Sequence, residues 1–144
     1  MIRRLMLADA EFIAHDLTRE LMNYDEPIPP FATRYPGKLE SCLINPFQTF
    51  DGKPLYRGLI RKAAVLFYGV IKDHPFVNGN KRMAVTLTLI FLFFNNKWLE
   101  TSPYELYEMA NAVAKSKPES RDKVLDLLVR YFNISLVNLP VSEQ

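Results

Sequence analysis

The fold of this chain depends most on residues 83–94, which read MAVTLTLIFLFF. The run contains no glycine or proline, and its twelve residues are fewer than the roughly 20 needed to span a bilayer. Because the run is apolar on every side, we expect it to form the central buried helix of a bundle. Val, Thr, Ile and Phe also favour sheets, so a pair of buried strands is the alternative. The length of the unbroken run favours the helix.

Apolar residues at helical spacing predict further helices on both sides of this run. The first should bury Phe12, Ile13, Leu17, Leu21 and Met22 on one face. Residues 25–37 follow it as a loop, because four prolines and one glycine cannot continue a helix. The helices expected outside the central run span residues 9–24, 38–44, 55–72, 103–115 and 121–132.

A small β-hairpin is predicted at residues 47–56, where two aromatic-bearing arms flank Asp51-Gly52. This dipeptide readily supplies the positive φ angles of a tight hairpin turn. Pro54 confines the hairpin to an edge, because proline cannot donate to a ladder of hydrogen bonds. The sequence therefore predicts an all-α fold, a helical bundle with a central buried helix and one small hairpin. We expect residues 1–144 to form a single domain.

The composition excludes several classes of protein. With 144 residues, 49% of them hydrophobic, the chain has the size and the core of one ordinary domain. A net charge of +2 is too small to indicate a nucleic-acid or membrane partner, and no helix-turn-helix pattern stands out. Cys42 is the one cysteine, so an internal disulfide and a cysteine zinc site are excluded. The first residues lack the apolar core of a secretory signal, so we expect a cytoplasmic protein.

The functional signal lies at residues 74–82, His-Pro-Phe-Val-Asn-Gly-Asn-Lys-Arg. Gly79 permits a sharp turn, Asn80 can cap the next helix, and the free N–H groups of that helix attract an anion. Lys81 and Arg82 stand where the helix dipole repels cations by roughly 0.3–1 kcal/mol each. A bound phosphate would reverse this penalty. His74 could then accept a proton from an attacking hydroxyl. Alternatively, His-Pro ends one helix, Asn80 caps the next, and both cations are solvated.

Together these residues resemble the signature loop of the Fic/Doc family, whose pattern is His-Pro-Phe-x-acid-Gly-Asn-Gly/Lys-Arg. The likeness covers roughly residues 35–100. It includes Leu39-Glu40-Ser41, the hairpin, Lys62-Ala63-Ala64 and Phe94-Asn95-Asn96. The helix–loop–helix context makes the nine-residue match specific.

The resemblance implies a role for each residue of the loop. His74 would be the general base that activates a Ser, Thr or Tyr hydroxyl of a target protein. Asn80, Lys81 and Arg82, with backbone amides around Gly79, would hold the phosphates of ATP, and Arg82 would neutralise charge in the transition state. Phe76 would anchor the loop in the core.

The hairpin corresponds to the flap of the family, which adds the target segment as an extended strand. The flap residues would be Phe47, Gln48, Thr49 and Phe50. A plain surface hairpin is the alternative reading.

Two positions decide the expected chemistry. Asn78 stands where the family usually places an acid that coordinates Mg²⁺, and its neutral amide should hold the metal more weakly. Lys81, where most Fic enzymes have Gly, resembles the Doc (death-on-curing) branch, whose toxin is a kinase of a translation factor. We therefore expect a Doc-like toxin that transfers phosphate. Fic-type AMP transfer is one alternative, and a weakly catalytic binding module with an emptied metal site is another.

Regulation in many family members depends on a helix carrying Ser/Thr-x-x-x-Glu-Gly/Asn. Residues 101–105 have the Thr-to-Glu spacing, but Leu106 follows, so we interpret them as a plain helix start. An antitoxin acting in trans is then the expected inhibitor. Two other residues are given structural roles: Cys42 as a small semi-buried residue and His15 as a structural or exposed residue, not a metal ligand.

Overall fold

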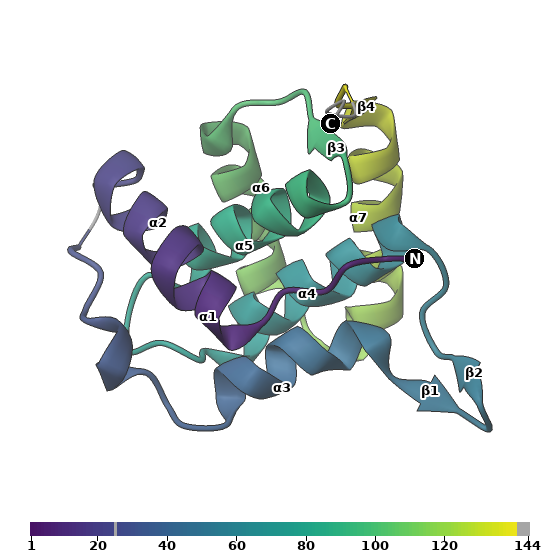
Figure 1. Cartoon of the computed structure of the whole chain (residues 1–144), viewed down its shortest axis with the longest axis horizontal. Coiled ribbons are helices and arrows are strands. Elements are labelled where there is room, and N and C mark those ends of the chain that lie inside the picture. The colour runs from purple at the N-terminus through teal and green to yellow at the C-terminus, as the bar shows by residue number, and fades with distance from the viewer. Residues whose placement is uncertain (25, 141–144) are drawn as a thin grey trace.

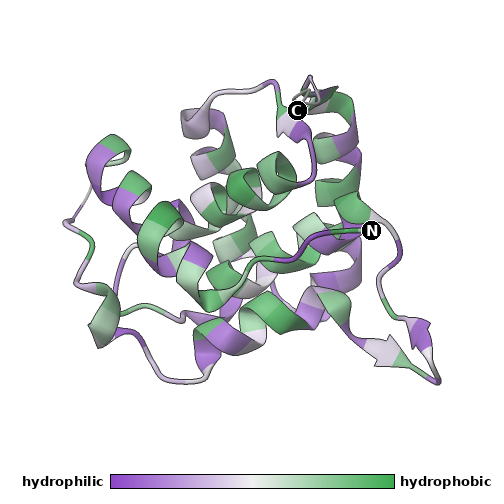
Figure 2. Cartoon of the chain, in the orientation of Figure 1, coloured by the Kyte–Doolittle hydropathy of each residue, from purple (hydrophilic) through white to green (hydrophobic). Residues whose placement is uncertain are grey.

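The apolar run lies within α5 (Asn80–Phe94), which packs beside α4 (Leu59–Asp73) at the centre of the molecule (Figure 1). The computed structural model describes residues 1–24 and 26–140. Every residue from Arg82 to Leu92 of α5 is buried, as is every residue from Lys62 to Tyr68 of α4. Both helices are accordingly hydrophobic along most of their length (Figure 2). The predicted central helix is confirmed, and it has a second central helix as its partner.

The other helices cover this pair, close to the positions that the sequence predicts. The start of the helix predicted at residues 55–72 moves: Gly58 has a φ of 83°, and α4 begins only after it, at Leu59. Short 3-10 turns occupy Phe31–Thr33, Asn45–Phe47 and Pro118–Ser120. The covering helices are α1 (Leu7–Asp9), α2 (Asp16–Leu21), α3 (Lys38–Ile44), α6 (Pro103–Lys115) and α7 (Arg121–Ser135).

The first predicted helix is present, but only part of its predicted buried face is correct: Met22 is buried, and Ile13 and Leu17 pack half-buried against the core. A π-helical segment, Ala10–His15, joins α1 to α2. The residues that face the core recur every fourth position, at Ala10, Ala14, Thr18 and Met22. Phe12 and Leu21 are instead 68% and 73% exposed. Small side chains bring this helix close to α5, so apolarity alone misassigned part of the face.

Two small antiparallel sheets complete the fold. β1 (Thr49–Phe50) pairs with β2 (Lys53–Pro54) across Asp51 and Gly52, whose φ angles are 55° and 75°. This is the predicted hairpin, and it projects from the bundle (Figure 1). The second sheet, β3 (Lys97–Leu99) with β4 (Leu136–Asn138), was not predicted. Its strands are far apart in sequence, so no turn motif in the sequence predicts that they pair.

Among the described residues, no helix has both the length and the apolarity that a bilayer crossing needs.

Candidate functional site

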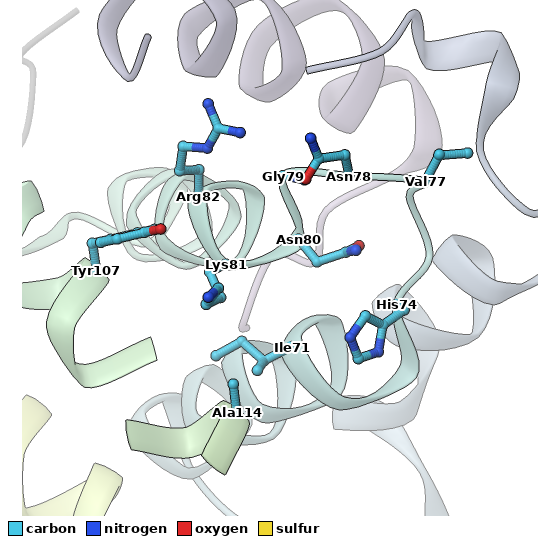
Figure 3. A pocket seen from close by; sticks show the side chains of 10 residues that line it. All are labelled: Ile71, His74, Val77, Asn78, Gly79, Asn80, Lys81, Arg82, Tyr107 and Ala114. Atoms are coloured by element: carbon cyan, nitrogen blue, oxygen red, sulfur yellow. The ribbon is translucent and has the colours of Figure 1, made fainter. Parts of the chain in front are cut away.

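The loop between α4 and α5 borders a cavity of about 240 Å³ (Figure 3). Residues 77–82 form one wall, and Ile71 and His74 at the end of α4 form another. Tyr107 and Ala114 of α6 close the third side. The structure therefore brings together the residues that the sequence predicts for one site, and it adds a wall from α6. The volume is below the 300–1,000 Å³ typical of closed small-molecule pockets, so the cavity suits a phosphate chain more than a whole nucleotide.

His74 ends α4 in a left-handed conformation, with a φ of 51°. Such a backbone costs about 1–3 kcal/mol for a residue other than glycine, and it is found at helix ends and turns as well as at functional sites. The imidazole Nδ1 lies 3.1 Å from the carbonyl oxygen of Lys72. A proton on Nδ1 donates to this carbonyl, which leaves Nε2 as the basic nitrogen. The side chain is exposed, so an incoming hydroxyl can reach it.

Phe76 fixes the loop to the core. Its ring is buried, and its centroid lies 6.2 Å from that of His15 and 6.0 Å from that of Phe31. The predicted anchoring role of Phe76 is confirmed, as is the structural role of His15. His15 Nε2 contacts the carbonyl oxygen of Pro29 at 3.0 Å.

Asn80 braces the loop instead of capping the helix. Its side-chain oxygen accepts from the N–H of Phe76, and its side-chain nitrogen donates to the carbonyl of Phe76, both at 2.9 Å. The cap of α5 is Gly79, with a φ of 80°. The predicted cap was therefore misplaced by one residue. Glycine takes the left-handed position, and a Cβ there would stand 2.7 Å from Cγ1 of Ile28.

Lys81 extends across the cavity to α6. Its Nζ donates to Oδ1 of Asn111 at 2.8 Å and lies 5.7 Å from the centroid of the Tyr107 ring. Both contacts fix the ammonium group beside the cavity rather than in bulk solvent. The alternative in which Lys81 is simply a solvated side chain is therefore wrong.

Arg82 is not solvated either. It is 2% exposed, and its guanidinium donates to the backbone carbonyls of Met22, Tyr24 and Glu26 at 3.1, 2.8 and 2.5 Å. Carbonyl oxygens beyond the end of α2 therefore compensate the charge that the sequence left unexplained. The guanidinium points away from Lys81 and His74 (Figure 3). The bonds use three of its five N–H groups, and the side chain still lines the cavity.

Asn78 lies beside a carboxylate that the sequence did not reveal. Its Nδ2 donates to Oε2 of Glu26 at 2.9 Å, and its Oδ1 accepts from the N–H of Gly79 at 2.8 Å. Mg²⁺ is bound through one or two carboxylates plus phosphates, and the Glu26 carboxylate fits that role. The oxygen of Asn78 faces the N–H of Gly79, so it would have to turn to join Glu26 in holding the ion. Within the part of the chain that the structure describes, no three His, Cys, Asp or Glu residues gather as a metal cluster.

The predicted flap residues lie apart from this cavity. Thr49 and Phe50 are exposed, and none of the four is among the described residues that line the cavity. Gln48 donates to Oδ1 of Asn45 at 2.9 Å. Phe47 is half-buried, with its ring centroid 6.0 Å from that of Phe91.

The start of α6 has the plain form that the sequence predicts. Ser102 is its cap and accepts from the N–H of Glu105 at 3.0 Å. The hydroxyl of Thr101 donates to the Glu105 carboxylate. The Glu105 carboxylate is therefore hydrogen-bonded to Thr101 at the start of its own helix.

Several residues of the site were missed by the sequence analysis. Glu26 sits in the proline-rich segment and contacts Asn78. On α6, Tyr107 and Ala114 line the cavity, and Asn111 accepts from Lys81. Their relation to the loop is purely tertiary, since each lies 25 or more residues away from it in the chain. A polar residue on an amphipathic helix, such as Asn111, gives no signal of what it faces.

Comparison with models of protein families gives a match that includes the loop of residues 74–82. A model of the Fic/DOC family matches residues 7–92, more than half of the chain. The chain belongs to the Fic/DOC family. Fic/DOC proteins generally transfer nucleotide-derived groups to proteins. Neither the curated proteins nor the solved structures give a significant match. The Fic/DOC match includes the first helix and ends before α6, so the wall that holds Lys81 lies outside it.

Proposed function

We propose that this Fic/DOC protein transfers phosphate from ATP to a Ser or Thr hydroxyl of a target protein, as a Doc-like toxin. The observation that carries the proposal is Lys81, whose ammonium group is tied to Asn111 and Tyr107 beside the cavity. A fixed cation crowds the polyphosphate path that a glycine would leave open. It thus favours a nucleotide whose terminal phosphate faces His74.

His74 acts as the general base in this reaction. Its Nε2 accepts the proton of the target hydroxyl while the hydroxyl oxygen forms a bond to the γ-phosphorus. The bond between that phosphorus and the bridging oxygen breaks, and ADP leaves with the electron pair. The Lys72 carbonyl stabilises the resulting imidazolium through the proton on Nδ1.

The phosphates are held by groups at the start of α5. The N–H groups of the first helical turn have no intrahelical acceptor and attract anions. Lys81 contributes a cation that Asn111 and Tyr107 hold beside the cavity, and Arg82 contributes positive charge at the cavity wall. Asn80 keeps the loop in shape through Phe76 and is a positioning residue.

Asn78 and Glu26 are the residues that would hold Mg²⁺. The ion supplies positive charge to phosphate oxygens when it is bound. Because Asn78 is neutral, Asn78→Asp should lower the Mg²⁺ concentration needed for ATP binding, and Glu26→Gln should raise it. Calorimetric titration of ATP at several Mg²⁺ concentrations measures both shifts. An unchanged Mg²⁺ requirement in both variants would contradict this assignment.

The partners follow from the same proposal. The substrate protein offers a Ser, Thr or Tyr hydroxyl, and an antitoxin restrains the enzyme in trans. We place the protein in the cytoplasm, since its one cysteine, Cys42, is free and a reducing compartment keeps it so.

The test is label transfer from ATP in a bacterial lysate with Mg²⁺. Label from the γ-phosphate alone supports the kinase, whereas label from the α-phosphate indicates AMP transfer. His74→Ala is the control, and it should lower transfer by about 10²–10⁴-fold. If no His74-dependent label is found, even with Mn²⁺ or other nucleotides, the result would indicate a binding module instead of an enzyme.

The role of Lys81 has its own test. Lys81→Gly should abolish transfer or change the transferred group, since it removes the cation beside the polyphosphate path. Asn111→Leu is the matched variant, because it keeps the lysine and removes its tie to α6. The same product at the same rate in Lys81→Gly would contradict the role of Lys81.

A further inference from the structure

A second cavity, of about 180 Å³, lies on the opposite side of the last turn of α4 from the catalytic loop. Ile71 and His74 line the loop cavity, whereas Gly69 and Asp73 line the second one. Its remaining wall includes residues at the base of the hairpin and at the start of α7. We call it the flap-side cavity, and its polar lining is Asn45, Gln48, Tyr56, Tyr68, Asp73 and Arg121.

The position of the flap-side cavity links two parts of the proposed reaction. Gln48 belongs to the hairpin that is expected to align the target, and Asp73 directly precedes His74. A target segment that runs from the hairpin to His74 therefore passes this cavity. The space is roughly that of six water molecules, which suits one long side chain.

The charges of the lining favour one kind of side chain. The Arg121 guanidinium is engaged, because its Nη2 donates to the Tyr56 hydroxyl at 2.9 Å and its Nη1 lies 3.7 Å from Asp122. It also lies against the rings of Tyr56 and Tyr68, 5.8 and 5.6 Å from their centroids. Its charge is thus already shared among groups of this chain.

The Asp73 carboxylate, in contrast to the Arg121 guanidinium, has only a weak hydrogen-bond partner. It is exposed, and its one hydrogen bond among the described residues is a long contact of 3.8 Å from the Cys42 thiol. A carboxylate with so weak a partner can accept strong charge-assisted hydrogen bonds from an ammonium or guanidinium group. The amides of Asn45 and Gln48 bond to each other at 2.9 Å and offer no competing charge.

We propose that the flap-side cavity is a subsite for a basic side chain, Lys or Arg, of the target protein next to the hydroxyl that is modified. The inference rests on the proposed function, since it concerns the same protein substrate. Gly69 forms part of the floor, where an added Cβ would meet Asp73 Oδ2 and Cys42 Sγ at 3.9 Å each. The absence of a side chain at Gly69 keeps the space beside the carboxylate open.

The experiment measures peptide binding by the full chain. Synthetic peptides carry a central Thr, with Lys, Arg, Glu or Ala placed in turn at each flanking position. We expect one position at which Lys or Arg binds about tenfold more tightly than Glu or Ala. Asp73→Lys should reverse this preference towards Glu. Gly69→Leu, which fills the space without changing charge, should abolish it.

Controls separate this subsite from the general charge of the protein. Asp16→Lys makes the same charge change at an exposed position of α2, and it should leave the preference unchanged. Equal binding of all peptides by the unmodified chain overturns the subsite, as does a preference that survives both Asp73→Lys and Gly69→Leu. Label transfer from ATP is scored separately on the same peptides. Selective binding without any transfer would overturn the proposed function and keep the subsite.

Discussion

Two separate constraints require glycine at position 79: its left-handed backbone conformation and the closeness of the Ile28 side chain. Its φ of 80° is unfavourable for any side chain, and a Cβ would lie 2.7 Å from Ile28. Gly37 has nearly the same φ, 84°, but a Cβ there would meet nothing within 4 Å. The two glycines therefore separate the cost of conformation from the cost of crowding.

We predict that Gly79→Ala lowers the free energy of unfolding more than Gly37→Ala does. Gly37→Ala should cost about 1–2 kcal/mol for the left-handed backbone. Gly79→Ala should cost about 1–3 kcal/mol more, because Ile28 must be displaced. Urea unfolding of both variants gives the comparison, and equal losses would contradict the close approach seen at Ile28.

Cys42 is expected to be chemically inert in the folded protein. Burial, and then the neighbouring carboxylate of Asp73, raise the pKa of its thiol to about 12, from an ordinary 9.0. The side chain is 1% exposed, more buried than the sequence suggested. The raised pKa alone lowers the thiolate fraction about a thousandfold.

The reaction of Cys42 with a disulfide reagent at pH 8 should therefore be at least a thousandfold slower than that of a free thiol. Unfolding in urea should restore the ordinary rate and serves as the control. Because the folded state favours the protonated thiol, Cys42 should also reduce stability as the pH rises above 9.0. Fast labelling of the native protein would contradict the buried position.

At the scale of residues, the sequence predicted the loop and not its partners. Gly79 and Phe76 could be interpreted because their roles follow from their own chemistry, a turn and an apolar anchor. Arg82 could not, because its compensation comes from carbonyls at Met22, Tyr24 and Glu26. Backbone carbonyls are the same in every residue, so no sequence pattern marks the ones that will accept.

Among the elements, the hairpin is held to the bundle by a buried lysine. Lys62 of α4 donates from its Nζ to the carbonyl of Tyr56, and this Nζ lies 5.7 Å from the centroid of the Phe47 ring. Burial lowers the pKa of Lys62 below its usual value. Its contacts lie at both ends of the hairpin segment, so they set the direction in which β1 and β2 leave the bundle.

Lys62→Met should loosen the hairpin while changing global stability little. The variant removes a buried charge, which favours folding, and leaves the Tyr56 carbonyl without its donor, which costs about 1–3 kcal/mol. We expect these two effects largely to offset each other. Hydrogen exchange at residues 49–56 should become faster. Lys53→Met, on exposed β2, is the matched control and should leave exchange at Tyr56 and Phe47 unchanged. Unaltered exchange in Lys62→Met would show that Lys62 does not hold the hairpin.

The helices and the hairpin were predictable because each has a local cause. Residues 38–44 and 103–115 form helices with the predicted ends, since Pro46 and Ser102-Pro103 mark those boundaries. The buried face of the first helix was predicted only in part, because alanines and Thr18 face the core there beside Met22. Close approach of two helices selects small side chains, and a pattern of large apolar residues cannot reveal it.

Considered as a whole, the molecule brings both ends of the described chain to the turn after α5. Asn95 Oδ1 accepts from the N–H of Arg3 at 2.7 Å, and its Nδ2 donates to the carbonyls of Arg3 and Phe91 at 2.8 Å each. The next residue, Asn96, accepts from the N–H of Leu139 at 2.9 Å. Figure 1 shows β4 beside β3, which follows this turn. These contacts close the bundle at the end of α5 opposite the loop of residues 74–82.

Asn95→Ala should therefore destabilise the whole fold, whereas Asn96→Gly should not. Asn95→Ala removes two hydrogen bonds that join Arg3 of the N-terminal segment to the end of α5, and a third to the carbonyl of Phe91 within α5. We expect a loss of about 1–3 kcal/mol and a fall in Tm of about 2–4 °C per kcal/mol. Asn96 has a φ of 63°, so glycine relieves backbone strain there and offsets its greater freedom in the unfolded chain. Its hydrogen bond to Leu139 uses the backbone and survives the change. Thermal unfolding followed by circular dichroism measures both variants. Equal Tm values for Asn95→Ala and the unchanged chain would mean that the N-terminal segment adds nothing to the stability of the central helix.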